Sequence, residues 1–358
     1  MVWILIGLIG LTYLINKWTL FYGFNDLFYR MEIEKNQAEI GEEIQIYSIV
    51  ENRKRMTVPF LKINERFPKG FNIWDNRYAL FIMPNQRVRR GYKIIGGKRG
   101  LYTIEYVYLE LGDFIGFKSK RQYMKVNKEI VILPEKVDLY KSLEPIGALN
   151  GNISVRRWIL DDPLMTIGIR EYTGNEPERF IHWPSSIKYN NLMVKNFDFT
   201  TDNSIIVVLN IETMKPSWQP IEEDIIERAI SLTRAVMEEC ENLKIPYGFA
   251  SNAHNSKSIH ERGYFYHPGL GQNHLSSFLE ILGRMDYKVD TFFENTLRNM
   301  AKRQGHYTTV VIITPRILDT YIEPINILSQ TVNRTVIISV EPEHLDDFND
   351  NIIKYRSR

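Results

Sequence analysis

The run SIIVVL at residues 204–209 decides the fold of the C-terminal part of the chain. It carries no charge, and a continuous apolar run of this length is typical of a strand buried on both faces of a parallel sheet. A helix should follow, because Pro220 suits a first helical turn and the acidic residues 222–224 suit the positive end of a helix dipole. Apolar residues then recur at helical spacing from Ile226 to Cys240, which places Cys240 in a core.

Strand-like and helix-like segments continue to alternate after this helix. Strands are predicted at residues 245–250, 308–313 and 335–340, and helices at 275–285, 292–302 and 318–331. This alternation indicates a doubly wound parallel sheet, which we predict over residues 201–345. Ligands of such sheets collect at the carboxyl ends of the strands, so function is expected in the loops after Leu209 and Ile313.

The middle of the chain, residues 30–135, has the pattern of strands. Leu61, Ile63 and Phe67 alternate with Lys62, Asn64 and Arg66. A period of two indicates a half-buried strand, and similar short runs recur between turn signals. We therefore predict a β-sandwich-like domain over residues 30–135.

The densest basic run of the chain lies within this middle part. It comprises Arg87, Arg89, Arg90, Lys93, Lys98 and Arg99, with Tyr92 among them. We interpret it as a solvated hairpin face, since no nucleic-acid motif accompanies it. The alternative is a surface for anionic headgroups or RNA.

The N-terminus is strongly apolar. Residues 1–15 carry no charged side chain, and apolar residues resume after Lys17 as far as Phe24. This predicts a transmembrane anchor over residues 1–24, with the basic residues behind it holding the soluble body in the cytoplasm. The predicted location is therefore the cell membrane, as a single-pass protein. A cleaved signal peptide is the alternative, but the basic start and the cleavage site of such a peptide are absent.

Composition limits the remaining classes of protein. An apolar fraction of 44% and a charged fraction of 25% fit a globular protein rather than a disordered one. The net charge of +2 gives no chain-wide field that favours nucleic acid, so no nucleic-acid partner is expected. A single cysteine cannot form an internal disulfide.

The stretch between the two predicted domains, residues 136–200, carries the most specific motif. Residues 168–199 read GIREYTGNEPERFIHWPSSIKYNNLMVKNFDF. This resembles the signature of the domain of unknown function 58 family, roughly R-E-Y-x-x-G-D-x-x-R-x-I-x-W-x-x-S. The positions in register are Arg170, Glu171, Tyr172, Gly174, Arg179, Ile181, Trp183 and Ser186, whereas Asn175 replaces the usual Asp.

The resemblance implies a fold and a partner. It implies a membrane protein with a von Willebrand A-like domain that works with a MoxR-type AAA+ ATPase in the assembly or maturation of other proteins. The binding residues expected from the motif are Arg170, Glu171, Tyr172, Gly174, Arg179, His182 and Trp183. They form either a docking surface or a buried clamp between domains. Our hypothesis makes Trp183 structural and leaves Arg170 and Arg179 exposed to a partner.

Metal binding is not expected. Related von Willebrand A domains hold Mg²⁺ with D-x-S-x-S after the first strand, where carboxylate and hydroxyl oxygens suit a hard cation. The corresponding residues Asn210, Glu212 and Thr213 are degenerate candidates with one carboxylate. The sequence thus predicts no cofactor.

Together these features predict a membrane-anchored, non-enzymatic binding or assembly protein whose partners are proteins and the membrane. The fold class expected is α/β plus β, with an N-terminal transmembrane helix. Two alternatives remain open: a metal-dependent von Willebrand A-type adhesion module, and a membrane-associated enzyme that uses His182. No recognisable nucleophile accompanies that histidine.

Overall fold

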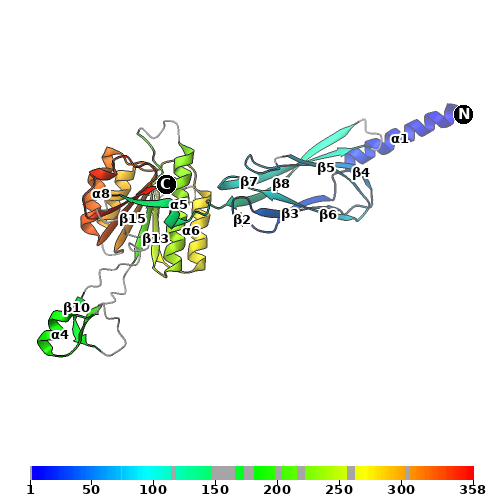
Figure 1. Ribbon diagram of the computed structural model, residues 1–358. Helices are drawn as coiled ribbons and strands as arrows, with labels where there is room; N and C mark the ends of the chain where they lie inside the picture. Colours follow the sequence, from blue (N-terminus) through cyan, green and yellow to red (C-terminus); the bar gives the residue numbers. More distant parts are fainter. Residues whose placement is uncertain are drawn as a thin grey trace. The chain divides into compact units, whose positions relative to one another are not determined.

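The protein is described by a computed structural model (Figure 1). It describes residues 2–73, 75–113, 118–146, 166–172, 181–197, 204–215, 222–255, 263–303 and 307–358. The chain divides into two compact units. Unit 1 comprises Met1–Glu135 and Leu279–Met285, and unit 2 comprises Lys136–Phe278 and Asp286–Arg358.

Helix α1 (Val2–Tyr22) opens unit 1 and overturns one prediction. Among the described residues, no helix has the length and apolar character needed to cross a membrane. The transmembrane anchor over residues 1–24 is therefore wrong, and so are the transmembrane part of the fold class and the single-pass membrane location. Asn16 and Lys17 interrupt the apolar run, and the residues before them span only about 22 Å at ~1.5 Å per residue, against a bilayer core of ~30 Å.

The rest of unit 1 consists mainly of two sheets. One has the order β1-β3-β6 and the other the order β2-β8-β7-β4-β5. Their bounds are β1 Leu27–Ile33, β2 Gln37–Ala38, β3 Glu43–Asn52, β4 Val58–Arg66, β5 Asp75–Ile82, β6 Arg87–Ile95, β7 Gly100–Gly112 and β8 Ser119–Ile132. One hydrophobic core contains side chains from both sheets, so the two sheets pack face to face.

The alternation predicted on β4 is confirmed. Leu61, Ile63 and Phe67 are buried in the core, whereas Lys62 and Asn64 are half-buried and Arg66 is exposed. The outer side of β4 is therefore mainly polar and the inner side mainly apolar, with the buried Glu65 as the exception.

Unit 2 is built on a seven-stranded sheet with the order β14-β13-β12-β15-β16-β17-β9. The bounds are β9 Leu143–Ile146, β12 Ile205–Leu209, β13 Tyr247–Ser251, β14 Tyr264–Gly269, β15 Thr309–Thr314, β16 Arg334–Ser339 and β17 Ile352–Ser357. The five central strands are parallel, and the edge strands β14 and β9 are antiparallel to their neighbours. Strands β9 and β17 lie outside residues 201–345, so the sheet extends beyond the predicted range.

Helices lie on both faces of this sheet (Figure 1). The bounds are α2 Leu139–Ser142, α5 Glu223–Asn242, α6 Gln272–Arg284, α7 Phe293–Lys302 and α8 Asp319–Thr331, with a 3₁₀ turn at Leu345–Asp347. Helices α7 and α8 share one core with alternate residues of the central strands, such as Ile206 and Val208. Helix α5 buries Ile226, Ala229 and Cys240, as its apolar stripe predicts.

Candidate functional site

The signature segment forms a small hairpin with a helix. Strand β10 (Thr166–Glu171) pairs antiparallel with β11 (Met193–Phe197), and α4 (Trp183–Tyr189) lies between them in sequence. Two backbone bonds hold the segment to β11: Tyr172 N–H donates to Leu192 O at 2.8 Å, and His182 N–H donates to Met193 O at 2.7 Å. The motif therefore folds locally.

His182 is the N-cap of α4. Its Nδ1 accepts a hydrogen bond from Ser185 N–H at 3.3 Å and lies 2.8 Å from Ser185 Oγ. Ser186 Oγ donates to His182 O at 3.0 Å and accepts from Met193 N–H at 2.8 Å. Because Ser185 and Ser186 are buried, neither hydroxyl is presented to a substrate. These contacts satisfy a helix terminus, which is a structural role.

The other motif residues are only partly described. Arg170 and Glu171 are exposed on β10, and Tyr172 is half-buried. Arg170 Nη1 donates to Glu171 O at 3.3 Å. Gly174, Asn175 and Arg179 lie outside the described residues.

Large apolar side chains on α4 are exposed. Trp183 is 60% exposed, Ile187 80% and Tyr189 60%. Trp183 and Ile187 are four residues apart, so they share one face of the helix. Trp183 is therefore not packed within its own segment, and the hypothesis that it is a structural residue stays a prediction. We call Trp183, Ile187 and Tyr189 the α4 patch; Ile169 and Leu192, also exposed, lie in the same small segment.

The second candidate region is the carboxyl edge of the seven-stranded sheet, after β12. Asn210, Glu212 and Thr213 are all buried there. The Asn210 side chain is fully engaged: Nδ2 donates to Thr314 Oγ1 at 3.0 Å, and Oδ1 accepts from Asn252 Nδ2 at 2.8 Å and from Glu212 N–H at 2.9 Å. These bonds fix the loop but use the oxygen that a metal would need.

Glu212 is the one acidic residue of this loop. Its Oε2 accepts hydrogen bonds from Tyr321 Oη at 2.8 Å and from Phe293 N–H at 3.3 Å. Its Oε1 is buried and has no hydrogen-bond partner among the described residues. Burial raises the pKa of the Glu212 carboxyl, and the bonds to Tyr321 and Phe293 oppose that shift. The carboxylate is thus held by α7 and α8 at an energetic cost.

A lysine supplies the positive charge in this region. Lys215 Nζ donates to both carboxylate oxygens of Glu294, at 2.7 and 2.6 Å, and to Thr320 Oγ1 at 2.9 Å. The ammonium also lies 5.3 Å from the Phe292 ring centroid and 5.5 Å from that of Tyr321. Its charge lowers the pKa of Glu212, whereas that of Glu294 raises it.

This donor set does not suit a divalent cation. The described residues contain no group of three or more His, Cys, Asp or Glu side chains arranged to hold a metal. Asn210 and Thr314 bond to each other, and the Lys215 ammonium lies against the Glu294 carboxylate, where it would repel a metal ion. The sequence could not reveal this, because Lys215, Glu294 and Thr320 meet only in three dimensions.

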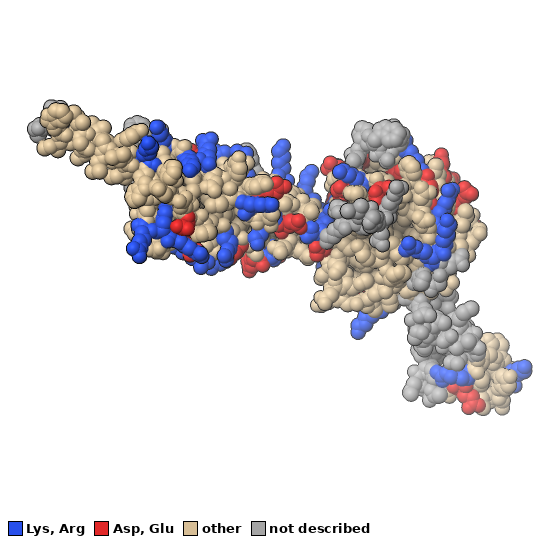
Figure 2. All heavy atoms as spheres, turned by 180° about the vertical axis from the view of Figure 1, so that it is seen from behind, with Lys and Arg blue, Asp and Glu red and all other residues tan. Residues whose placement is uncertain are grey.

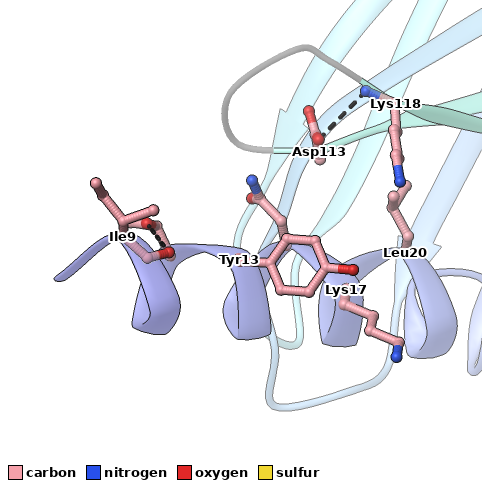
Figure 3. Close-up of a pocket in the computed structure, with 8 residues that line it drawn as sticks. Ile9, Tyr13, Lys17, Leu20, Asp113 and Lys118 are labelled. Carbon is pink, nitrogen blue, oxygen red and sulfur yellow. Dashed lines mark hydrogen bonds between the residues drawn. The ribbon is translucent and has the colours of Figure 1, made fainter. Parts of the chain in front are cut away.

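Unit 1 holds a cavity of about 390 Å³ beside α1 (Figure 3). Ile9, Tyr13 and Leu20 line it on the helix, and Asp113 and Lys118 line the opposite wall. Lys118 N–H donates to Asp113 Oδ2 at 3.3 Å. Its walls combine apolar side chains with one acidic residue, Asp113, and two lysines, Lys17 and Lys118.

Comparisons with known proteins add little. No family model and no curated protein matches the chain. One similar solved structure is the CARDB domain of the PF1109 protein from Pyrococcus furiosus, in complex with di-metal ions. It is 11% identical, covers 28% of this chain and 91% of that chain, and has a TM-score of 0.21. A likeness of this size carries no argument about fold or function.

Proposed function

We propose that this chain is a non-enzymatic protein-binding module whose partner docks on the α4 patch. The observation that carries the proposal is the exposure of Trp183, Ile187 and Tyr189, at 60%, 80% and 60%, on one short helix. Exposed apolar side chains grouped in this way mark interaction surfaces in soluble proteins. Tryptophan and tyrosine are also the residues that most often dominate binding energy.

The polar neighbours of the patch support the same function. Arg170 and Glu171 are exposed on the adjoining strand, and Lys188 lies 5.7 Å from the Tyr189 ring centroid. An apolar centre with charged residues at its margin is the usual composition of a protein interface. His182 caps the helix, so its role in the proposal is to fix α4 rather than to react.

The partner we propose is a MoxR-type AAA+ ATPase. The support for it is the resemblance of residues 168–199 to the signature of the domain of unknown function 58 family, whose members are associated with such ATPases. The patch lies within that signature, so the part of the chain that carries the resemblance also exposes apolar surface.

The test is a binding titration between the purified full chain and a purified MoxR-type ATPase, with ATP analogue, with ADP and without nucleotide. Trp183→Ala and Ile187→Ala should each weaken binding by at least about 30-fold, the factor that corresponds to a hot-spot residue. Their melting temperatures should stay close to that of the parent, because both side chains are exposed.

Ile327→Ala is the matched control, since Ile327 is also exposed on a helix of unit 2 but lies on α8. It should bind like the parent. Parent-like binding by both α4 variants would refute docking on this patch, and absence of binding in all three nucleotide states would refute the proposed partner.

A further inference from the structure

The charge of this protein is divided unevenly along the chain. Residues 1–135 contain 21 Lys and Arg against 14 Asp and Glu, a net charge of +7, whereas residues 136–358 contain 24 against 29, a net charge of −5. The chain-wide value of +2 conceals this difference. Figure 2 shows one face of unit 1, where basic side chains are far more numerous than acidic ones. Unit 1 therefore attracts anions.

The outer face of the five-stranded sheet concentrates part of this charge around exposed tyrosines. Strand pairing places Arg77, Asn64, Tyr108 and Tyr123 side by side across β5, β4, β7 and β8. Three strand spacings of ~4.8 Å make this row about 14 Å long. Tyr123 is 67% exposed and Tyr108 41%. We call this row, with the side chains flanking it on the same face, the tyrosine face.

Cations flank the row on both sides. On one side, Lys125 pairs with Tyr106 and Arg66 pairs with Asp75. On the other side, Lys62 and Arg121 lie opposite Glu110. The Arg66 guanidinium lies 5.2 Å from the Tyr108 ring centroid. Neither Lys62 nor Arg66 makes an ion pair within the described part of the chain. Their charge is thus available to a ligand.

The face is hollowed as well as charged. A groove of about 410 Å³ is lined by Lys62, Asn64, Arg66, Arg77, Tyr108, Leu109, Glu110, Arg121 and Tyr123. Four of these side chains are cationic and one is anionic. Tyr123 packs edge-to-face on Tyr106 and Tyr108, with centroids 6.3 and 5.9 Å apart, so the rings are held in place before any ligand arrives.

We propose that the tyrosine face binds single-stranded nucleic acid. Every base has a planar face that can stack on tyrosine, and phosphates can pair with the flanking Lys and Arg side chains. A row of about 14 Å has room for two or three nucleotides. The inference is independent of the proposed docking on α4, because it concerns another unit and another ligand.

An acidic polypeptide fits this face less well. The backbone N–H and C=O groups of a sheet point along the sheet plane, so a peptide lying on its face would lose hydration from its own backbone without gaining partners there. A nucleic-acid strand instead presents charged phosphates, which can pair with the Lys and Arg side chains, and planar bases, which can stack on the tyrosine rings.

The test is fluorescence anisotropy of a labelled oligothymidylate of 12 nucleotides titrated with the full chain at 50 and 200 mM NaCl. Tyr123→Ala and Tyr108→Ala should each weaken binding about 5- to 100-fold, the range measured for loss of one stacked base. Lys62→Ala and Arg66→Ala should weaken binding and reduce the dependence of log K on log salt by about 0.7 each.

Arg89 and Tyr47 provide the matched control. They form a similar pair, with the guanidinium 3.8 Å from the ring centroid, on the other sheet of unit 1. Arg89→Ala and Tyr47→Ala remove the same chemical groups and should leave oligonucleotide affinity within about twofold of the parent. Circular dichroism and melting temperature should establish that all variants fold.

Three results would overturn the proposal. The first is no anisotropy change at 50 mM NaCl up to millimolar protein. The second is binding that the tyrosine substitutions leave unchanged and that heparin displaces, which would indicate general attraction to polyanions. The third is equal affinity for an acidic peptide of 12 glutamates, which would assign the face to a protein ligand.

Discussion

The phenolic hydroxyl of Tyr92 donates a hydrogen bond of 2.5 Å to Oε2 of Glu65, a carboxylate with no exposed surface inside unit 1. Tyr29 and Tyr78 donate to Oε1 at 2.8 and 2.9 Å, and Ser48 also donates to it. Asn76 Nδ2 donates to Oε2 at 2.9 Å. Glu65 is on β4, whereas Tyr29, Ser48 and Tyr92 belong to the facing sheet, so one carboxylate joins the two sheets.

This network predicts a severe effect of Glu65→Ala. The substitution leaves five donors, one buried and four half-buried, without this acceptor, and removing a buried charged partner in such networks costs about 3–5 kcal/mol. Tyr92→Phe removes one bond and should cost about 1–2 kcal/mol. Urea unfolding followed by tyrosine fluorescence measures both changes. Tyr123→Phe, which alters an exposed hydroxyl, should be neutral; equal stability of Glu65→Ala and the parent would contradict the role assigned to the network.

The Lys215–Glu294 pair should be coupled in stability. Both side chains are about three-quarters buried or more, with 25% and 20% exposed, so the pair is screened less than a surface ion pair. Lys215→Met should destabilise the fold by about 1–3 kcal/mol, because it leaves Glu294 near Glu212 without a counter-charge. The double variant Lys215→Met with Glu294→Gln should regain part of this loss. A double-mutant cycle measures the coupling, and strictly additive effects would argue against it.

Glu212 should make stability depend on pH. Burial raises the pKa of its carboxyl in the fold, so the protonated form is favoured there. The stability this group contributes is fully present below its unfolded pKa and is lost as pH rises through the raised folded pKa. Glu212→Gln should therefore melt higher than the parent at pH 7, and the difference should shrink toward pH 4. A variant that melts lower at pH 7 would show that the ionised carboxylate is needed.

His344 should also make stability depend on pH, in the range where histidine titrates. Its Nδ1 lies 2.9 Å from Asp347 Oδ2 and 3.6 Å from Asp319 Oδ1, and the bond to Asp347 raises the pKa of the imidazole. The added stability is present below the ordinary histidine pKa and is lost as pH rises through the folded value. His344→Asn, which tolerates the left-handed backbone at φ 61°, should lose stability at pH 5.5 and little at pH 8.5. Thermal melts at both values decide this.

Magnesium should leave the parent unchanged. A ligand stabilises a fold only by RT ln(1 + [L]/Kd), and close to Glu212 the oxygens of Asn210 and Thr314 are already hydrogen-bonded while Lys215 occupies Glu294. The melting temperature of the full chain should shift by less than about 1 °C between EDTA and millimolar Mg²⁺. A shift of several degrees that Glu212→Ala abolishes would contradict this.

The local sequence pattern by itself determined the type and position of several helices and strands. The apolar run at 204–209 became β12 (Ile205–Leu209), the stripe after Pro220 became α5, and the alternation from Leu61 to Phe67 became a half-buried strand. Each pattern repeats with the period of the element that it forms, so a short window is sufficient to read it. The basic run from Arg87 to Arg99 is predicted to be a solvated face; Arg87, Arg89 and Lys93 are exposed, but Arg99 is buried, so the prediction is wrong at the end of the run.

Tertiary structure alone decided which distant residues meet. The sequences of β9 and β17 show no strong hydrophobic periodicity. They join the sheet because Leu143–Ile146 pairs with Lys354–Ser357, more than 200 residues away in the sequence. The same holds for Glu65 with its three tyrosines, for Lys215 with Glu294, and for Tyr108 beside Tyr123 between cations. The hydropathy of a segment indicates only whether its side chains are exposed to water or buried in a core. Which residue contacts a given charge or ring depends instead on the register of strands that are far apart in the sequence.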